Sequence, residues 1–280
     1  MAEITAALVA KLRAQTGAGM MECKKALVET QGDVEAAVDL LRKKGSATSE
    51  KKAAKEAREG VIAQYIAPGA KRGLLVEVNC QTDFVARNES FQAFAGEVAR
   101  LLVEQPDANL EALREEQVAR IGENIRISRH EVLEVSGTGL VAAYIHHGAK
   151  IGVLVEVSAG QEATLGAPAF QQFVKDIALQ VTAASPSAVS REELDPAVVA
   201  KEREIAAEQV KDKPAQVIEK IVTGKLEKYF QGVCLVDQGF IKRNAEVTVK
   251  EHLESLAKEL GDTISVKRFL RFQVGEVSAE

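Results

Sequence analysis

The chain has 280 residues, of which 46% are hydrophobic and 28% are charged, and its formal net charge at pH 7 is −5. This length is typical of two or three domains, and the composition indicates a globular protein rather than a disordered one. The negative charge and the low aromatic content of 4% argue against direct nucleic-acid binding through phosphate neutralisation or base stacking.

Signals for a membrane, for secretion or for a bound metal are missing from the sequence. No stretch approaches 18 consecutive apolar residues, and the N-terminus lacks the basic start and apolar block of a secretory signal. We therefore expect a cytoplasmic protein without a membrane span. The three cysteines are widely spaced and no Walker-type phosphate loop is present, so we expect neither a metal site nor a cofactor.

Residues 1–45 have the pattern of three short helices. Apolar residues recur at helical spacing up to Leu12, a glycine-rich break follows, and a second helix begins near Met20. Asp33 is a suitable N-cap for a third helix, which we expect to end at Gly45.

A polar stretch over residues 46–59 follows the third helix. It supplies no apolar face, so it predicts a mobile or helical linker, and we take residues 1–54 as a small module with its linker. Its positive charges are Lys51, Lys52, Lys55 and Arg58.

An internal repeat is the most informative feature of the sequence. The stretch that starts at Gly60 resembles the stretch that starts at Gly139, and sixteen of the forty aligned positions from residue 60 to residue 99 are identical. Each copy has the pattern of a strand, a glycine-rich turn, a second strand and a helix. We therefore predict two related subdomains with antiparallel sheets, the first over 55–136 and the second beginning at 137.

The second copy contains an insertion. Residues 187–231 carry two charged helical segments separated by Lys213-Pro214, and we predict an antiparallel hairpin. The side chains expected to face each other are Val198, Val199, Ile205 and Val210 on the first segment and Val217, Ile218, Ile221, Leu226 and Tyr229 on the second. The second subdomain is thus divided into 137–186 and 232–280. The predicted fold class is α+β.

The two copies differ in the segment after the second strand. The first copy has Asp83-Phe84 where the second has Glu162-Ala163. A duplicated frame with one diverged loop indicates that the loop has acquired a function, with Phe84 as a projecting apolar wedge. The alternative is that Thr82 is only an N-cap, Asp83 a first-turn carboxylate and Phe84 a core residue.

Other candidate residues permit similar alternatives. Met20 and Met21 fit either a small core or a soft contact surface. His146-His147 lie at a strand end, where adjacent side chains point to opposite faces, so a surface position fits them better than a metal site. Cys80 has no histidine near it in sequence, and a half-buried thiol fits it better than a nucleophile.

Several segments resemble the elongation factor Ts family, and the similarity extends over essentially the whole chain. The two long signatures are Thr16–Leu27 and Asn79–Ala86, and the shorter matches are Ile121–Asn124 and His147–Val153. The resemblance implies a ubiquitin-associated-like three-helix module, a duplicated α+β core and an inserted helical hairpin. It also implies a non-enzymatic guanine-nucleotide exchange factor, which binds elongation factor Tu and accelerates GDP release by disturbing its magnesium and phosphate site.

The resemblance further implies which residues contact the partner. They are Leu12, Met20, Met21, Thr82, Asp83, Phe84, Ile121, Gly122 and His147. The hairpin mediates homodimer contacts in some members of the family. Some members also continue into a further helical module, and because this sequence ends at Glu280 we expect that contact to be missing or reduced.

Three alternative functions remain open from the sequence. A scaffold or chaperone would hold the GTPase without accelerating nucleotide release. An enzyme built around Cys80 and Asp83 would show thiol-dependent turnover. RNA binding through the basic residues 51–58 would weaken steeply with salt.

Overall fold

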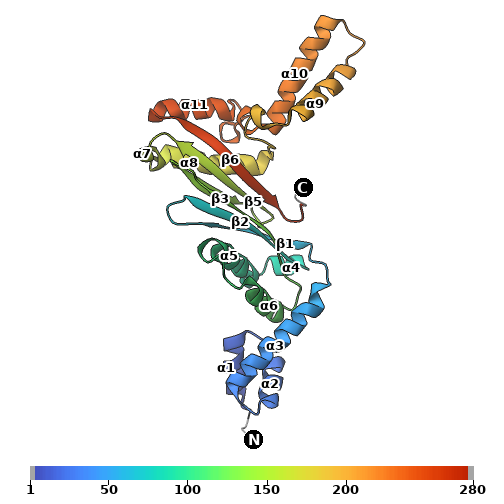
Figure 1. Cartoon of the computed structure of the whole chain (residues 1–280), viewed down its shortest axis with the longest axis vertical. Helices are drawn as coiled ribbons and strands as arrows, with labels where there is room; N and C mark the ends of the chain where they lie inside the picture. Colours follow the sequence, from blue (N-terminus) through green and yellow to red (C-terminus); the bar gives the residue numbers. More distant parts are fainter. Residues whose placement is uncertain (1–3, 277–280) are drawn as a thin grey trace.

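The computed structural model describes residues 4–276 and shows an elongated molecule (Figure 1). A helical module lies at one end, a core of stacked helices and sheets fills the middle, and a helical hairpin projects from the other end. The combination of separate helices and antiparallel sheets confirms the α+β class. No helix among residues 4–276 is long and apolar enough to cross a membrane.

The N-terminal module contains the three expected helices. They are α1 (Ala6–Thr16), α2 (Met20–Glu29) and the first half of α3 (Val34–Ala53). The carboxylate of Asp33 accepts a hydrogen bond from the backbone N–H of Ala36, so α3 begins at the predicted N-cap. Leu12, Cys23 and Leu27 form the centre of a small apolar core.

The prediction that the third helix ends at Gly45 is wrong. Helix α3 continues to Ala53, through most of the stretch expected to be a linker, because it packs against α6 (Leu110–Ile121). A Cβ added at Gly45 would lie 3.3 Å from the Cβ of Ala119, so the glycine permits a close approach of the two helices. Tertiary packing therefore outweighs the tendency of glycine to end a helix.

The core is built from two halves that follow the same order. In the first half, β1 (Glu59–Ile66), β2 (Arg72–Cys80) and β3 (Arg126–Glu134) form an antiparallel sheet in that order, covered by α4 (Asp83–Ala86), α5 (Glu89–Glu104) and α6. In the second half, β4 (Gly139–Ile145), β5 (Ile151–Ala159) and β6 (Ile264–Gln273) form an equivalent sheet. Its helices are α7 (Glu162–Leu165), α8 (Pro168–Ala184) and α11 (Val249–Leu260).

The two sheets pack face to face, with helices on the outer side of each sheet (Figure 1). The contacts between them are reciprocal: the N–H of Ile62 donates to the carbonyl of Ala149, and the N–H of Val141 donates to the carbonyl of Ala70, both at 2.7 Å. Since Ile62 corresponds to Val141 in the repeat, the halves are related by an approximate two-fold axis. The apolar seam consists of Ile62, Leu75, Leu133, Val141, Leu154 and Phe272.

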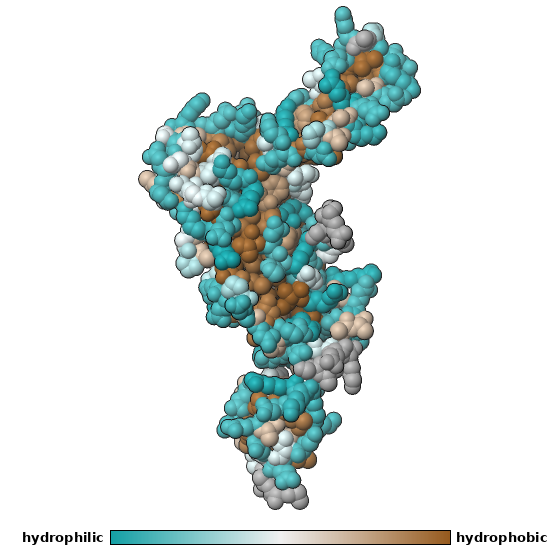
Figure 2. Space-filling view, viewed as in Figure 1, coloured by the Kyte–Doolittle hydropathy of each residue, from teal (hydrophilic) through white to brown (hydrophobic). Residues whose placement is uncertain are grey.

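The inserted hairpin consists of α9 (Pro196–Glu208) and α10 (Ala215–Val233). The predicted contact between its helices is correct only in part. Val198, Ile205 and Val217 are exposed, whereas the other six side chains of the predicted set are half-buried: Val199, Val210, Ile218, Ile221, Leu226 and Tyr229. Two helices alone enclose only a narrow seam, and among the described side chains of α9 and α10 only Ala206 and Val222 are fully buried. Figure 2 shows apolar surface on the hairpin as well as over the core.

Short irregular segments connect the hairpin to the core. The 3-10 turn η1 (Arg191–Glu193) lies before the hairpin, and η2 (Leu235–Asp237) and η3 (Ile241–Arg243) follow it. The Arg191 guanidinium bonds to the carboxylates of Glu227 and Asp237 and thereby fixes the base of the hairpin. Helix α11 then begins after its N-cap Thr248, which forms a capping box with Glu251.

Candidate functional site

The segment that diverged between the two copies forms a single exposed helical turn, α4. Its first residues are Asp83 and Phe84, and the Phe84 side chain is 82% exposed. Phe91 and Phe94 on the next helix are buried, so the apolar core of this half is filled without Phe84. Phe84 is therefore not a core residue, and its ring projects into solvent.

The other two residues of this turn have the capping roles that the alternative interpretation gave them. The hydroxyl of Thr82 accepts a hydrogen bond from the N–H of Val85 at 3.3 Å, as an N-cap does. Asp83 lies in the first turn and forms an ion pair with Arg87 at 3.2 Å. Because Ala86 faces the core, a helix of one turn must present its opposite side, with Phe84, to solvent.

Glu123 holds this turn from a distant part of the chain. Its carboxylate accepts hydrogen bonds from the N–H of Gln81 at 3.0 Å, the N–H of Thr82 at 3.1 Å and the Thr82 hydroxyl at 2.7 Å. The sequence analysis missed this residue, although it lies in the Ile121–Asn124 match. No local pattern indicates a contact between residues 41 positions apart.

Cys80 lies beneath the turn and is fully buried, rather than half-buried as the sequence suggested. Its thiol donates to the carbonyl of Thr82 at 3.2 Å. Burial, and next the carboxylate of Glu123, raise the pKa of the Cys80 thiol to about 12. A thiol of this kind is protonated at neutral pH and is not a nucleophile, which argues against the enzyme interpretation.

Ile121 and Gly122 lie directly before Glu123 and are therefore brought close to the α4 turn. Ile121 packs at the edge of the first-half core, and Gly122 is exposed at the end of α6. The carbonyl of Gly122 accepts a hydrogen bond from the ammonium of Lys52 on α3. The end of α6 thus lies between the α4 turn and the helix that carries the N-terminal module.

The N-terminal module presents an apolar face on α2. Met20 and Met21 are 47% and 63% exposed, so both side chains are available at the surface. Val28, which the sequence analysis missed, is exposed two turns beyond Met21, a spacing of seven residues that places both on one face. Leu12, also predicted to contact a partner, is fully buried in the core of this module.

His147 is exposed in the turn just beyond the end of β4, which confirms the surface position that the sequence favoured. In the same turn, the ammonium of Lys150 donates to the carboxylate of Glu59 and to the carbonyl of Gly60. Glu59 pairs with Cys80 across β1 and β2, so the His147 turn lies at the end of the first sheet that carries α4.

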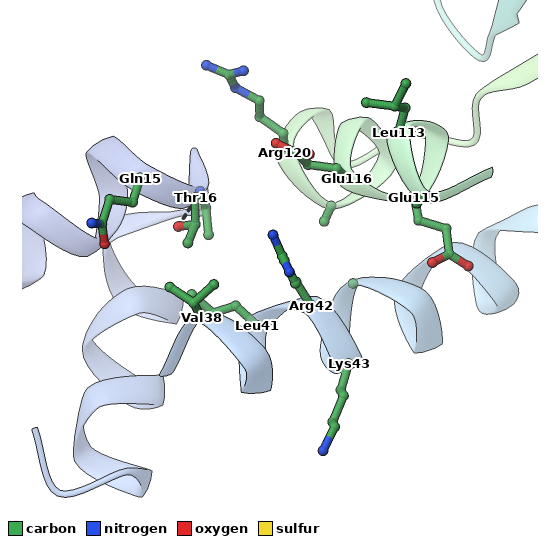
Figure 3. Close-up of a pocket in the computed structure, with 14 residues that line it drawn as sticks. Gln15, Thr16, Val38, Leu41, Arg42, Lys43, Leu113, Glu115, Glu116 and Arg120 are labelled. Carbon is green, nitrogen blue, oxygen red and sulfur yellow. Dashed lines mark hydrogen bonds between the residues drawn. The ribbon is translucent and has the colours of Figure 1, made fainter. Parts of the chain in front are cut away.

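A groove of about 490 Å³ separates the N-terminal module from α6 (Figure 3). Leu41 and Arg42 of α3 line one side, and Leu113 and Arg120 of α6 line the other. None of the residues predicted to contact a partner lines it. Residues 4–276 also contain no cluster of three or more His, Cys, Asp or Glu side chains that could hold a metal.

These observations favour a protein-binding surface over a cavity for a small molecule. An aromatic ring projects from a clamped turn, and a separate module presents two exposed methionines. Isolated exposed apolar residues are common on proteins, but a phenylalanine held almost wholly in solvent gains most when a partner covers it.

Comparison with known proteins identifies the family. The family described as Elongation factor TS matches residues 81–276. The chain is 44% identical to an elongation factor Ts of Symbiobacterium thermophilum and 41% identical to one of Clostridium botulinum; 99% and 98% of this chain and 93% of each relative are covered. One from Trichlorobacter lovleyi is 40% identical, again over 98% of this chain and 93% of the relative. The chain belongs to the elongation factor Ts family.

Proposed function

We propose that this protein is a guanine-nucleotide exchange factor that binds elongation factor Tu and accelerates GDP release during translation elongation in the cytoplasm. The observation that carries the proposal is the solvent-exposed ring of Phe84 on a clamped turn, in a chain of this family. Nucleotide release breaks no covalent bond, so the protein needs no nucleophile and is not an enzyme. The buried, protonated Cys80 agrees with this function.

The ring of Phe84 acts as a wedge. In the proposed complex it enters the partner near the magnesium ion and the phosphates of GDP, where magnesium demands near-ideal octahedral geometry. A small shift of the supporting segments then weakens the hold on the nucleotide. Each tenfold acceleration of release requires about 1.4 kcal/mol from the barrier, and burying one phenylalanine supplies about 1.5–3 kcal/mol.

Asp83 adds an electrostatic contribution next to the wedge. Its carboxylate pairs with Arg87, but the Arg87 side chain is largely exposed and the Asp83 side chain is partly exposed, so the pair is weak and can open on docking. The released carboxylate then repels the phosphates or competes for groups that hold them. Because Asp83 directly precedes Phe84, both effects act at the same place.

The remaining predicted residues enlarge the contact. Met20 and Met21 provide a soft surface for a helix of the partner, supported from beneath by Leu12. Ile121 and Gly122 continue the contact beside α4, and Thr82 keeps the turn in place. His147 contributes from the second half of the core. Coupling is reciprocal at equilibrium, so rebinding of nucleotide weakens the hold of the partner on the exchange factor.

The proposal is tested by the release of fluorescent GDP from elongation factor Tu in a stopped-flow instrument. We expect the native chain to accelerate release, and Phe84→Ala to slow the stimulated rate about tenfold, which corresponds to about 1.4 kcal/mol. Ile241→Ala is the control, since Ile241 is an exposed apolar side chain in the other half, and it should leave the rate unchanged. Binding without acceleration by the native chain would establish the scaffold alternative instead.

We also propose that the hairpin mediates a homodimer. Val198 and Ile205 are both exposed and lie two turns apart on α9, so they form one apolar stripe that a second copy could cover. Sedimentation equilibrium over a range of concentrations tests this: Ile205→Glu should shift the chain to the monomer. A native chain that stays monomeric at high concentration would contradict the proposal.

A further inference from the structure

We propose that Glu123 is a positioning residue for nucleotide exchange, because it fixes the turn from which Phe84 projects. The inference rests on the proposed function and adds a residue to it. Glu123 does not need to touch the partner, since it acts through the α4 turn.

The turn cannot hold itself in place. Helix α4 has only four residues, far fewer than an isolated helix needs to be stable in water. Its position therefore depends on contacts with the rest of the protein. Ala86 anchors one side in the core, and Glu123 fixes the start of the helix.

A continuous chain of hydrogen bonds leads from Glu123 past Phe84. The Thr82 hydroxyl donates to one oxygen of Glu123 and accepts from the N–H of Val85, while the N–H groups of Gln81 and Thr82 donate to the other oxygen. The bonded residues lie on both sides of Asp83-Phe84. Hydrogen bonds to a carboxylate are about twice as strong as neutral ones, so this clamp limits the movement of the ring.

Glu123 is itself held on both sides. Lys52 of α3 donates to the carbonyl of Gly122, and the side-chain amide of Asn124, which is buried, donates to the carbonyl of Lys55 at 2.6 Å. Residues 122–124 thus form a junction between α3 and the α4 turn. A wedge that presses into a partner needs this kind of rigid support, because a yielding turn would move aside.

The second half of the core provides a matched control. There Asp262 accepts hydrogen bonds from the N–H of Gln161 at 3.0 Å and from the hydroxyl of Thr164 at 2.6 Å, and it fixes the turn that begins α7. This clamp has the same structural task, but the turn carries Ala163 in place of Phe84. A variant of Asp262 therefore shows how much the loss of an equivalent clamp slows GDP release when the Phe84 turn is left intact.

The test compares full-length Glu123→Ala, Glu123→Gln and Asp262→Ala in the stimulated release of fluorescent GDP, over a range of exchange-factor concentrations. At saturating factor, we expect Glu123→Ala to slow release about fivefold, because a misplaced wedge loses its effect even when it is bound. Glu123→Gln should keep at least about half of the rate, because a glutamine can reach the same groups. Asp262→Ala should not change it.

A double mutant separates positioning from general damage. If Glu123 acts through the ring, Glu123→Ala should slow release less than about twofold when Phe84 is already alanine, whereas independent effects would multiply. An unchanged rate for Glu123→Ala, or a full fivefold effect without the ring, overturns the inference. Should Glu123→Ala fail to fold, Thr82→Ala decides in its place, because it removes the hydroxyl that joins Glu123 to Val85.

The result also separates this inference from the proposed function. If the native chain accelerates release and Phe84→Ala slows it, the proposed function stands whatever Glu123 does. If the native chain does not accelerate release and Phe84→Ala does not slow it, the proposed function is wrong, whatever the effect of Glu123→Ala.

Discussion

The turns α4 and α7 occupy the same place in the two halves of the core and differ at their tips. Each follows the central strand of its sheet, has four residues and is held by a carboxylate from a distant segment, Glu123 or Asp262. The first presents Phe84, and the second presents Ala163. The frame has thus been kept in both halves, while the projecting aromatic ring is present in one.

The two halves also differ beneath these turns. Glu77 and Glu156 correspond in the repeat, and both are buried at an irregularity in the central strand. Glu77 accepts hydrogen bonds from Arg129, Asn79 and the N–H of Gly275, whereas Glu156 pairs with the more exposed Arg268. The half that carries Phe84 therefore has the larger buried polar network.

The largest expected effect tests whether the larger network around Glu77 contributes more to stability than the network around Glu156. Glu77→Ala removes the buried carboxylate that accepts from Arg129, from the Asn79 amide and from the N–H of Gly275, and we expect it to lower the free energy of unfolding by about 3 kcal/mol. Glu156→Ala should cost about 1–2 kcal/mol, because water can solvate Arg268. Urea unfolding followed by circular dichroism measures both. Equal costs would show that the two networks are equivalent.

A smaller effect tests whether an aromatic ring on either turn is enough to accelerate GDP release. Moving the ring to the other turn, with Phe84→Ala and Ala163→Phe in one chain, should leave GDP release about tenfold slower than in the native protein. The second turn lacks the neighbouring end of α6 and the Met20-Met21 surface, so its ring cannot reach the same place on the partner. Stopped-flow release measures this, and full recovery of the rate would show that either half can serve.

The smallest expected effect concerns pH and the second clamp. The hydroxyl of Thr164, helped by the N–H groups of Thr263, Gln161 and Gly160, holds the pKa of Asp262 below its ordinary value of 3.8. A lowered pKa in the folded state stabilises the protein above the ordinary value, and this contribution disappears as the pH falls through the lowered one. The native melting temperature should thus exceed that of Asp262→Asn at pH 6, and the difference should become smaller as the pH falls below 3.8. A difference that does not change with pH in this acid range would contradict this account.

Much of the fold could be predicted from the sequence because its signals are local. The repeat, the alternating strands, the N-cap at Asp33 and the capping box at Thr248 each depend on residues close together in the chain. The end of α3 could not be predicted, because Gly45 normally indicates a helix end and only contact with Ala119 explains why the helix continues.

The candidate site could be predicted in part for the same reason. The difference between Phe84 and Ala163 is visible in the aligned copies, but whether the ring is buried depends on which side of α4 meets the core. The sequence does not indicate Glu123, because its hydrogen-bond partners are distant along the chain. It does not indicate Val28 either, because one valine on a helix has no distinctive pattern. The sequence also does not show whether Leu12 is buried or exposed, because the module is too small for a clear core pattern.

The reciprocal seam between the sheets bears on the origin of this asymmetry. Paired contacts such as those of Ile62 with Ala149 and of Val141 with Ala70 are the contacts that two identical half-length chains would make around a symmetry axis. In such an ancestor, every substitution would appear twice. Fusion into one polypeptide lets each half change alone, so one could gain a single ring and the other could accept the hairpin, while the shared interface kept both in place.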